Sequence, residues 1–149
     1  MGADMETRLR ALEDEAEIQR LAARFSDAVN ERDVVAFRSL WADQDAVWEI
    51  GEPLPPRSEG RDAIVGMLEG LFVVKHYFMQ MTHTGVIDID GDRATARFAI
   101  REHGRGEDTF YDDELVRQPD GWRFRRRSYL YRFLDQGPFP GNTYPVRPR

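Results

Sequence analysis

A histidine and a few acidic or amide side chains could carry proton-transfer chemistry. His83 lies in the alternating segment 78–90, on the face that also carries Met81 and Ile87. Because alternate residues of a strand point to the same side, this pattern predicts that His83 faces an apolar interior. A neutral imidazole in such a place can take a proton from carbon or from a hydroxyl group when another group orients its second nitrogen.

The orienting group could be a carboxylate or an amide oxygen. Glu102 follows Phe98 on the inward side of its own alternation, and Asp113 and Asn30 are the other candidates. A carboxylate beside a base can orient it or handle a second proton. The alternative interpretation is that His83 is an ordinary core histidine and that the acids lie at the rim of a sheet.

Several aromatic side chains could form a ligand pocket. A tyrosine hydroxyl can donate a hydrogen bond to a substrate carbonyl and so stabilise a developing enolate in a dry site, and Tyr111 and Tyr129 are candidates for this role. Aromatic and methionine side chains suit an apolar ligand of loose shape. Core packing explains the same residues equally well. The candidates for the pocket wall are Trp41, Trp48, Phe72, Met81 and Phe98.

The hydrophobic patterns predict three helices followed by two long hairpins. Apolar residues recur at helical spacing over 5–30, Asp33 can cap a short second helix, and Ser58 or Gly60 can open a third. The period then changes to two. This order is typical of an α+β fold in which an antiparallel sheet packs on helices. The predicted strands after the helices span 78–90, 94–102, 110–117 and 122–133.

Composition excludes several classes of function. The 149 residues carry 21 Lys and Arg against 27 Asp and Glu, and the net charge of −6 has the wrong sign for binding nucleic acid. Cysteine is absent and the three histidines lack metal-ligand spacing, so we expect no metal and no cofactor. Lys75 is the only lysine. The run 125–127 is all arginine, but its residues alternate between two sheet faces and can pair with the acids at 112–114.

The sequence lacks the patterns of membrane and secreted proteins. No apolar run approaches the roughly 20 residues that span a bilayer, and residues 1–6 resemble no secretory leader. We therefore expect a cytoplasmic protein that does not bind membranes. Its length suits one domain over 1–149, in which the segment 136–149, rich in proline, forms an extended tail.

Four passages in this order resemble the SnoaL-like branch of the nuclear transport factor 2-like superfamily. They are IQRLAARF at 18–25, AFRSLWAD at 36–43, VIDIDGDRATA at 86–96, and YDDELVR at 111–117 followed by GWRF at 121–124. The resemblance covers roughly residues 10–134. It implies a cone in which a strongly curved antiparallel sheet wraps around the long first helix, with a deep apolar pocket at one end.

The resemblance also implies where catalytic residues would lie. Dehydratases and a dehydrochlorinase of this family carry a Tyr or Lys on the first helix and an Asp five positions later, and the matching residues here are Phe25 and Asn30. Their catalytic His matches Gln80 or Met81, with His83 two or three positions later. An extra residue in the strand would bring His83 into that place.

Two more positions take a role from the resemblance. Asp113 matches a position that faces the pocket, and Arg132 is similar to an arginine near the end of the last strand, which reaches a substrate carboxylate or carbonyl. Phe25 would enlarge the apolar wall of the pocket.

Two functions follow from these patterns. The first is a cofactor-independent lyase or isomerase acting on a small, mostly apolar cyclic molecule, with His83 as base, Asp113 or Glu102 as its partner, and a tyrosine or Asn30 holding the oxygen. The second is a noncatalytic binding or accessory protein of the same fold. Relatives commonly associate through the outer sheet face, so the resemblance also implies a homo-dimer or homo-trimer.

Overall fold

A computed structural model of the chain describes residues 2–50, 57–75, 77–103, 107–135, 137 and 141–144. Within these residues, three helices precede the four long strands of one six-stranded sheet. The elements are α1 (Gly2–Asn30), α2 (Val34–Ser39), β1 (Val47–Glu49), β2 (Ser58–Glu59), α3 (Arg61–Val74), β3 (Met79–Asp90), β4 (Arg93–His103), β5 (Glu107–Gln118) and β6 (Gly121–Leu134).

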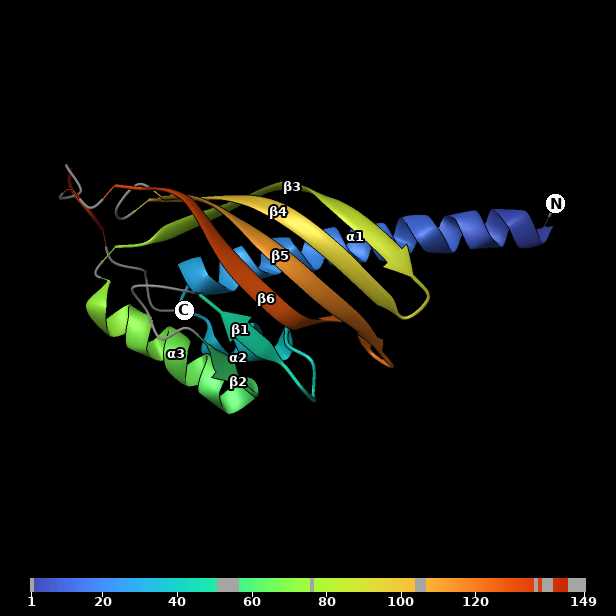
Figure 1. The fold of residues 1–149 in the computed structure, drawn as a ribbon, viewed down its shortest axis with the longest axis horizontal. Coiled ribbons are helices and arrows are strands. Elements are labelled where there is room, and N and C mark those ends of the chain that lie inside the picture. Colours follow the sequence, from blue (N-terminus) through green and yellow to red (C-terminus); the bar gives the residue numbers. More distant parts are fainter. Residues whose placement is uncertain are drawn as a thin grey trace.

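The sheet is strongly curved and is not closed. Its strand order is β2-β1-β6-β5-β4-β3, so the four long strands form a continuous meander. Figure 1 shows α1 lying across one face of this meander, with its N-terminal turns continuing beyond the strands. The predicted α+β fold, a curved sheet around a long N-terminal helix, is confirmed.

One pair of strands departs from the predicted antiparallel sheet. β1 pairs with β6 in the parallel direction, with Val47 opposite Arg126, and β2 then adds antiparallel to β1. The sheet is therefore mixed. The connection from β1 to β6 is long and includes α3, which is what a parallel pair requires.

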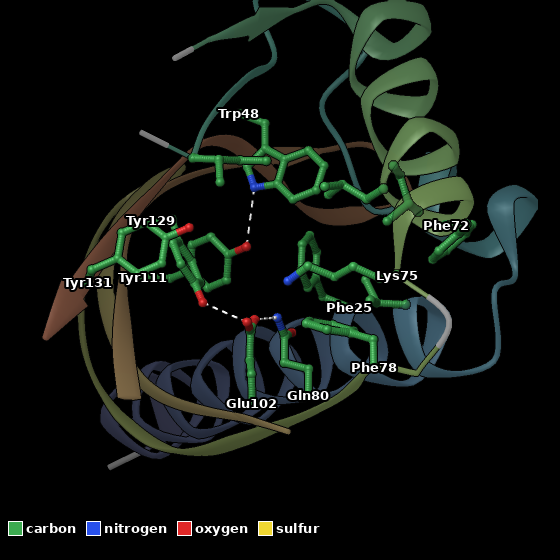
Figure 2. Close-up of a pocket in the computed structure, with 14 residues that line it drawn as sticks. Phe25, Trp48, Phe72, Lys75, Phe78, Gln80, Glu102, Tyr111, Tyr129 and Tyr131 are labelled. Atoms are coloured by element: carbon green, nitrogen blue, oxygen red, sulfur yellow. Dashed lines mark hydrogen bonds between the residues drawn. The ribbon is translucent and has the colours of Figure 1, made fainter. Parts of the chain in front are cut away.

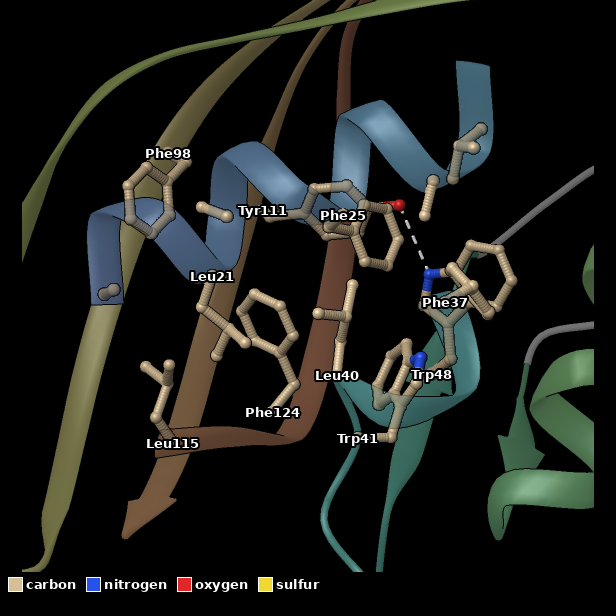
Figure 3. Close-up of a cluster of buried hydrophobic side chains, with 14 of the residues drawn as sticks. Leu21, Phe25, Phe37, Leu40, Trp41, Trp48, Phe98, Tyr111, Leu115 and Phe124 are labelled. Carbon is tan, nitrogen blue, oxygen red and sulfur yellow. Dashed lines mark hydrogen bonds between the residues drawn. The ribbon is translucent and has the colours of Figure 1, made fainter. Parts of the chain in front are cut away.

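The core forms between α1 and the concave side of the sheet. Ile18, Leu21, Phe25 and Val29 recur at helical spacing and are all buried, as the amphipathic pattern predicts. An aromatic cluster then surrounds Phe25, whose ring centroid lies 5.1 Å from that of Phe37 (Figure 3). The rings of this cluster come from α1, α2, the segment just after α2 and three strands, so it joins the helices to the sheet. The other rings around Phe25 are those of Trp41, Trp48, Tyr111 and Phe124.

A β-bulge in β3 changes which residues face the core. Thr82 pairs with Ile100 but Gly85 pairs with Phe98. Between these two pairs β3 advances by three residues and β4 by two, so β3 contains one extra residue. Because a shift of one residue moves side chains to the opposite face, Gln80 is buried before the bulge and His83 is exposed. The prediction that His83 faces the interior is therefore wrong, and the prediction for Ile87 after the bulge is confirmed.

Gly85 is needed at this bulge because its backbone lies against β4. A Cβ atom at Gly85 would lie 2.6 Å from the carbonyl oxygen of Arg97 and would also overlap the ring of Phe98. We expect Gly85→Ala to lower the free energy of unfolding by about 1–3 kcal/mol, as overpacking does, in urea denaturation. Gly70→Ala is the matched control, because no described atom outside the neighbouring helix backbone lies within 4 Å of the added methyl group; a loss in both variants would contradict the explanation.

A buried carboxylate joins α1 to the hairpin of β5 and β6. The Asp14 carboxylate accepts hydrogen bonds from Arg117 Nη1 and Nη2 at 2.6 and 2.7 Å, and a third from Trp122 Nε1 at 3.1 Å. The Arg117 guanidinium also lies 4.5 Å from the Trp122 ring centroid. These hydrogen bonds from Arg117 and Trp122 lower the pKa of Asp14, against the opposing effect of burial.

The contribution of Asp14 to the free energy of unfolding is therefore expected to vary with pH. A carboxyl whose pKa is lowered by folding stabilises the protein above its ordinary pKa, and this contribution is lost as the pH falls through the lower folded value. We expect Asp14→Asn to cost about 1.5–3 kcal/mol at neutral pH. The difference in unfolding free energy between wild type and Asp14→Asn, measured by thermal unfolding, should shrink as the pH falls below 3.8, the ordinary pKa of an aspartate. A difference that stays constant on acidification would contradict this.

The outer sheet face carries exposed ion pairs between neighbouring strands. Arg97 pairs with Asp112, and Arg101 pairs with Asp108. Association of copies through this face stays a prediction. The predicted extended tail, 136–149, lies largely outside the described residues. Within it, residues 141–144 are described and are exposed. None of the helices in the described part of the chain combines the length and the apolar character needed to cross a bilayer.

Candidate functional site

An apolar pocket opens between the end of α1, the inner face of α3 and the concave side of the sheet. It contains about 500 Å³ of space not filled by protein atoms, part of it open to solvent. Phe25 and Val29 of α1 and Leu68 of α3 form much of the apolar wall. Three tyrosines, Trp48 and a few polar groups complete it, and the labelled side chains surround the space in Figure 2. The tyrosines are Tyr111, Tyr129 and Tyr131.

Glu102 is the acidic side chain among the described residues of this lining, and two neighbours hold it in place. Its Oε1 accepts a hydrogen bond from Gln80 Nε2 at 2.7 Å, and its Oε2 accepts one from the Tyr129 hydroxyl at 2.7 Å. Gln80 is itself oriented by Ser26, whose hydroxyl donates to Gln80 Oε1 at 2.8 Å. Glu102 is 4 % exposed, so this network fixes a carboxylate at the wall of an apolar space.

Tyr111 places a hydroxyl group on another part of the wall. The indole Nε1 of Trp48, which can only donate, lies 3.2 Å from the Tyr111 oxygen. Tyr111 is therefore the acceptor in this bond, and among the described residues no acceptor is found for its own hydrogen. Burial raises the pKa of Tyr111, so the hydroxyl stays protonated and can donate to a ligand.

Six of the residues predicted from sequence lie together in this lining. Glu102 is the predicted catalytic residue among them, and the others were predicted as substrate contacts. The inward alternation of β4 and β5 explains why Glu102 and Tyr111 face the pocket. The five predicted contacts in the lining are Phe25, Trp48, Phe72, Tyr111 and Tyr129.

Two of the predicted catalytic residues have structural roles instead. Asn30 pins the end of α1 to β3, since its Nδ2 donates to the Gln80 carbonyl oxygen at 2.8 Å and its Oδ1 accepts from the Gln80 amide at 2.7 Å. Asp113 faces inward but its oxygens accept from Arg127 Nε and Nη2 at 2.8 and 3.0 Å. Burial raises the pKa of Asp113 to about 6, against the opposing effect of Arg127. Neither residue is part of the pocket lining.

Four predicted substrate contacts and the predicted base lie elsewhere. His83 is exposed because of the bulge, and Met81 is moved away from the lining with it. Trp41 and Phe98 are buried in the core beside the pocket. Arg132 is exposed on the other side of β6, where its guanidinium lies 5.4 Å from the Phe110 ring centroid.

Two polar residues of the pocket were not among the site residues predicted from sequence. Gln80 alternates with Met81, so a strictly regular strand with Met81 facing inward would turn Gln80 outward; a glycine inside a strand, here Gly85, is a known signal of the bulge that changes this. Lys75, the only lysine of the chain, also lines the pocket. Among the described residues there is no cluster of three side chains suited to a metal ion.

The SnoaL-like domain family matches residues 10–128. This match spans most of the chain. The protein belongs to the SnoaL-like family. No curated protein sequence matches it significantly.

Solved structures similar to this SnoaL-like chain share its fold at low sequence identity. Hexachlorocyclohexane dehydrochlorinase LinA-type3 from Novosphingobium barchaimii is 18% identical, with 95% of this chain and 99% of that one covered and a TM-score of 0.78. A proposed scytalone dehydratase from Novosphingobium aromaticivorans is 18% identical, with 89% and 91% covered and a TM-score of 0.75.

A third structure shows how varied such chains are. A protein of unknown function with a cystatin-like fold from Nostoc punctiforme is 18% identical, with 80% and 91% covered and a TM-score of 0.72. Identities this low establish the fold alone, because one fold hosts many functions. The activity of this SnoaL-like protein therefore has to be argued from its own pocket.

Proposed function

We propose that this protein is a cofactor-independent lyase or isomerase that moves a proton of a small, mostly apolar cyclic molecule. The observation that carries the proposal is the Glu102 carboxylate, held by Gln80 and Tyr129 at the wall of an apolar pocket. A carboxylate with little water around it is a stronger base toward carbon than one in bulk solvent. Glu102 thus replaces His83 as the proposed base.

The Tyr111 hydroxyl is the proposed electrophilic partner. Removing a proton from carbon is practicable when a neighbouring carbonyl takes up the negative charge, and a hydrogen-bond donor aimed at that oxygen stabilises the transition state. Tyr111 is suited to this because its oxygen already accepts from Trp48, which leaves its hydrogen available to an oxygen of the ligand. Figure 2 shows the Tyr111 hydroxyl and the Glu102 carboxylate both directed toward the open space.

In a dehydration of a β-hydroxyketone, the two groups would act in sequence. Glu102 takes the proton on the carbon next to the carbonyl, and the electron pair of that bond forms an enolate whose oxygen Tyr111 stabilises. The enolate then reforms the carbonyl and expels the β-hydroxyl group, which leaves as water with the proton returned by Glu102. The products are an enone and water, and no oxidant or cofactor is consumed. Without a leaving group, the same proton transfer moves a double bond.

The proposal is tested with ring ketones in heavy water. We would incubate the protein with cyclohexanone and 3-hydroxycyclohexanone and follow deuterium incorporation beside the carbonyl by NMR, together with the ultraviolet absorbance of the enone. We expect exchange or dehydration faster than in buffer alone. Ring ketones that bind but show no catalysed exchange would overturn the proposal.

The same outcome would favour the second candidate, a noncatalytic binding protein. One observation supports it: Phe25 and Asn30 stand where dehydratase-like relatives are expected to carry a proton donor and an acid, and Asn30 is engaged with the Gln80 backbone. In that case the hydrogen-bonded Glu102 would serve to orient a ligand. Ligand affinity without turnover is the measurement that separates the two candidates.

A further inference from the structure

The only lysine of the chain extends into the pocket. Lys75 follows the last residue of α3, and its side chain is part of the pocket lining together with Glu102. In Figure 2 the Lys75 ammonium group points from the α3 side toward the open space. The other 20 cationic side chains are arginines, and none of those in the described part of the chain belongs to this lining. Among the described residues, the lining thus carries one cation, from the end of α3, and one carboxylate, from β4.

The backbone of Lys75 is fixed by contacts with two elements. Its amide donates to the Leu71 carbonyl oxygen at 2.9 Å, which closes the end of α3. Its carbonyl oxygen accepts from Arg32 Nη2 at 2.9 Å, and Arg32 Nη1 also reaches the Phe72 carbonyl oxygen at 3.4 Å. Arg32 follows α1 closely, so the base of the Lys75 side chain is tied to both helices that border the pocket.

An aromatic ring lies beside the ammonium group. Lys75 Nζ is 4.7 Å from the centroid of the Phe78 ring, whose face attracts a cation. Charges attract more strongly in an apolar pocket than in water because the effective dielectric constant is lower. A ligand anion would therefore gain more from Lys75 than from an exposed cation, and the net charge of −6 means that anions are not drawn to the protein in general.

From this placement we infer that the pocket selects ligands that carry a carboxylate group on a small apolar ring. The carboxylate pairs with the Lys75 ammonium group, and the ring packs against Phe25 and Leu68. Glu102 comes from β4 and Lys75 from the end of α3, so the two charged groups enter the pocket from different elements. A carboxylate on a small ring would be the substrate class of the proposed function. This inference rests on the proposed function only because both use the same pocket.

The test compares a charged ligand with a neutral one of the same shape. Dissociation constants of cyclohexanecarboxylate and cyclohexanecarboxamide would be measured by calorimetry with the wild type, Lys75→Met and Lys75→Arg. We expect the wild type to prefer the carboxylate at least about tenfold. Lys75→Met should abolish this preference by weakening only the carboxylate, and Lys75→Arg should keep part of it.

The control removes an equal charge elsewhere. Arg38→Met on α2 takes away an exposed cation that pairs with Asp62, and it should leave the preference unchanged. A wild type without preference, or a preference that survives in Lys75→Met, would overturn the inference. The outcome is independent of turnover: carboxylate selectivity without proton exchange would refute only the proposed function, and proton exchange without selectivity would refute only this inference.

Discussion

Replacing Glu102 with glutamine is expected to lower the rate of proton exchange or dehydration by about 10²- to 10⁴-fold, the usual contribution of a general base. An amide has nearly the shape of a carboxylate but does not take up a proton near neutral pH. Ligand affinity should change little in comparison, because the apolar wall that holds the ring is untouched. The measurement is the deuterium incorporation described above, with affinity determined in parallel.

The variant should fold, since its hydrogen bonds are largely preserved. In the wild type, Gln80 and Tyr129 each donate to one oxygen of the Glu102 carboxylate. The single oxygen of the new amide can still accept from one of these two donors. When that oxygen accepts from Gln80, the new NH2 group faces the Tyr129 hydroxyl, which can accept a hydrogen bond as well as donate one. We therefore expect a modest loss of stability, which denaturation in urea would separate from the loss of rate.

Two further variants make the result specific. Tyr129→Phe removes one donor to Glu102 but keeps the carboxylate, so it should retain most of the rate that Glu102→Gln loses. His83→Ala alters the residue that the sequence favoured as base, and its exposed position predicts an unchanged rate. If instead His83→Ala stopped exchange and Glu102→Gln did not, the base assigned from the structure would be wrong.

The fold could be predicted because its main signals are local. The apolar stripe of α1 and the alternation of β4 are regular, and each buries the residues that the pattern predicts, such as Phe25 and Phe98. The pairing of arginines with acids on the adjacent strand could also be predicted from the sequence: Arg125 pairs with Glu114, and Arg127 pairs with Asp113. Such periodic features depend only on spacing along the chain.

The site was only partly predictable because two of its features are not periodic. The bulge in β3 reverses the faces of Gln80 and His83 by inserting one residue, and alternation alone does not reveal it. Lys75 enters the pocket because α3 ends there and β3 begins shortly afterwards, which depends on tertiary packing. Glu102, in contrast, lies on a regular strand, and the sequence placed it on the correct face.

Removing the guanidinium group of Arg127 is expected to have the largest effect on stability. Both side chains of the Arg127–Asp113 pair have 0% exposure, and the guanidinium carbon lies 4.2, 3.9 and 4.1 Å from the ring centroids of Phe25, Tyr111 and Phe124. Arg127→Met leaves the carboxylate buried without a partner. A broken buried pair typically costs about 3–5 kcal/mol, which denaturation in urea would measure.

Removing both charges should restore most of the lost stability. In the double variant Asp113→Leu with Arg127→Met, no buried charge remains to be compensated, and apolar side chains of similar size often replace such pairs at little cost. A double-mutant cycle would then show a strong favourable coupling between the two substitutions. A double variant less stable than Arg127→Met alone would contradict this account.

The loss of unfolding free energy in Arg127→Met should also depend on pH, and the burial of Asp113 sets the direction of this dependence. Burial raises the pKa of Asp113 to about 6 even beside Arg127, and loss of the guanidinium removes the main effect that opposes this rise. A carboxyl whose pKa is raised by folding stabilises the folded state fully below its ordinary pKa, and the contribution is lost as the pH rises through the folded value. In the variant, the protonated carboxyl is therefore tolerated and the ionised one is not. The difference in unfolding free energy between wild type and Arg127→Met should be largest at alkaline pH, should shrink as the pH falls toward about 6 and should change little below that value, where Asp113 is protonated in both folded proteins. The double variant has no carboxyl at position 113, so its own unfolding free energy should show none of this titration.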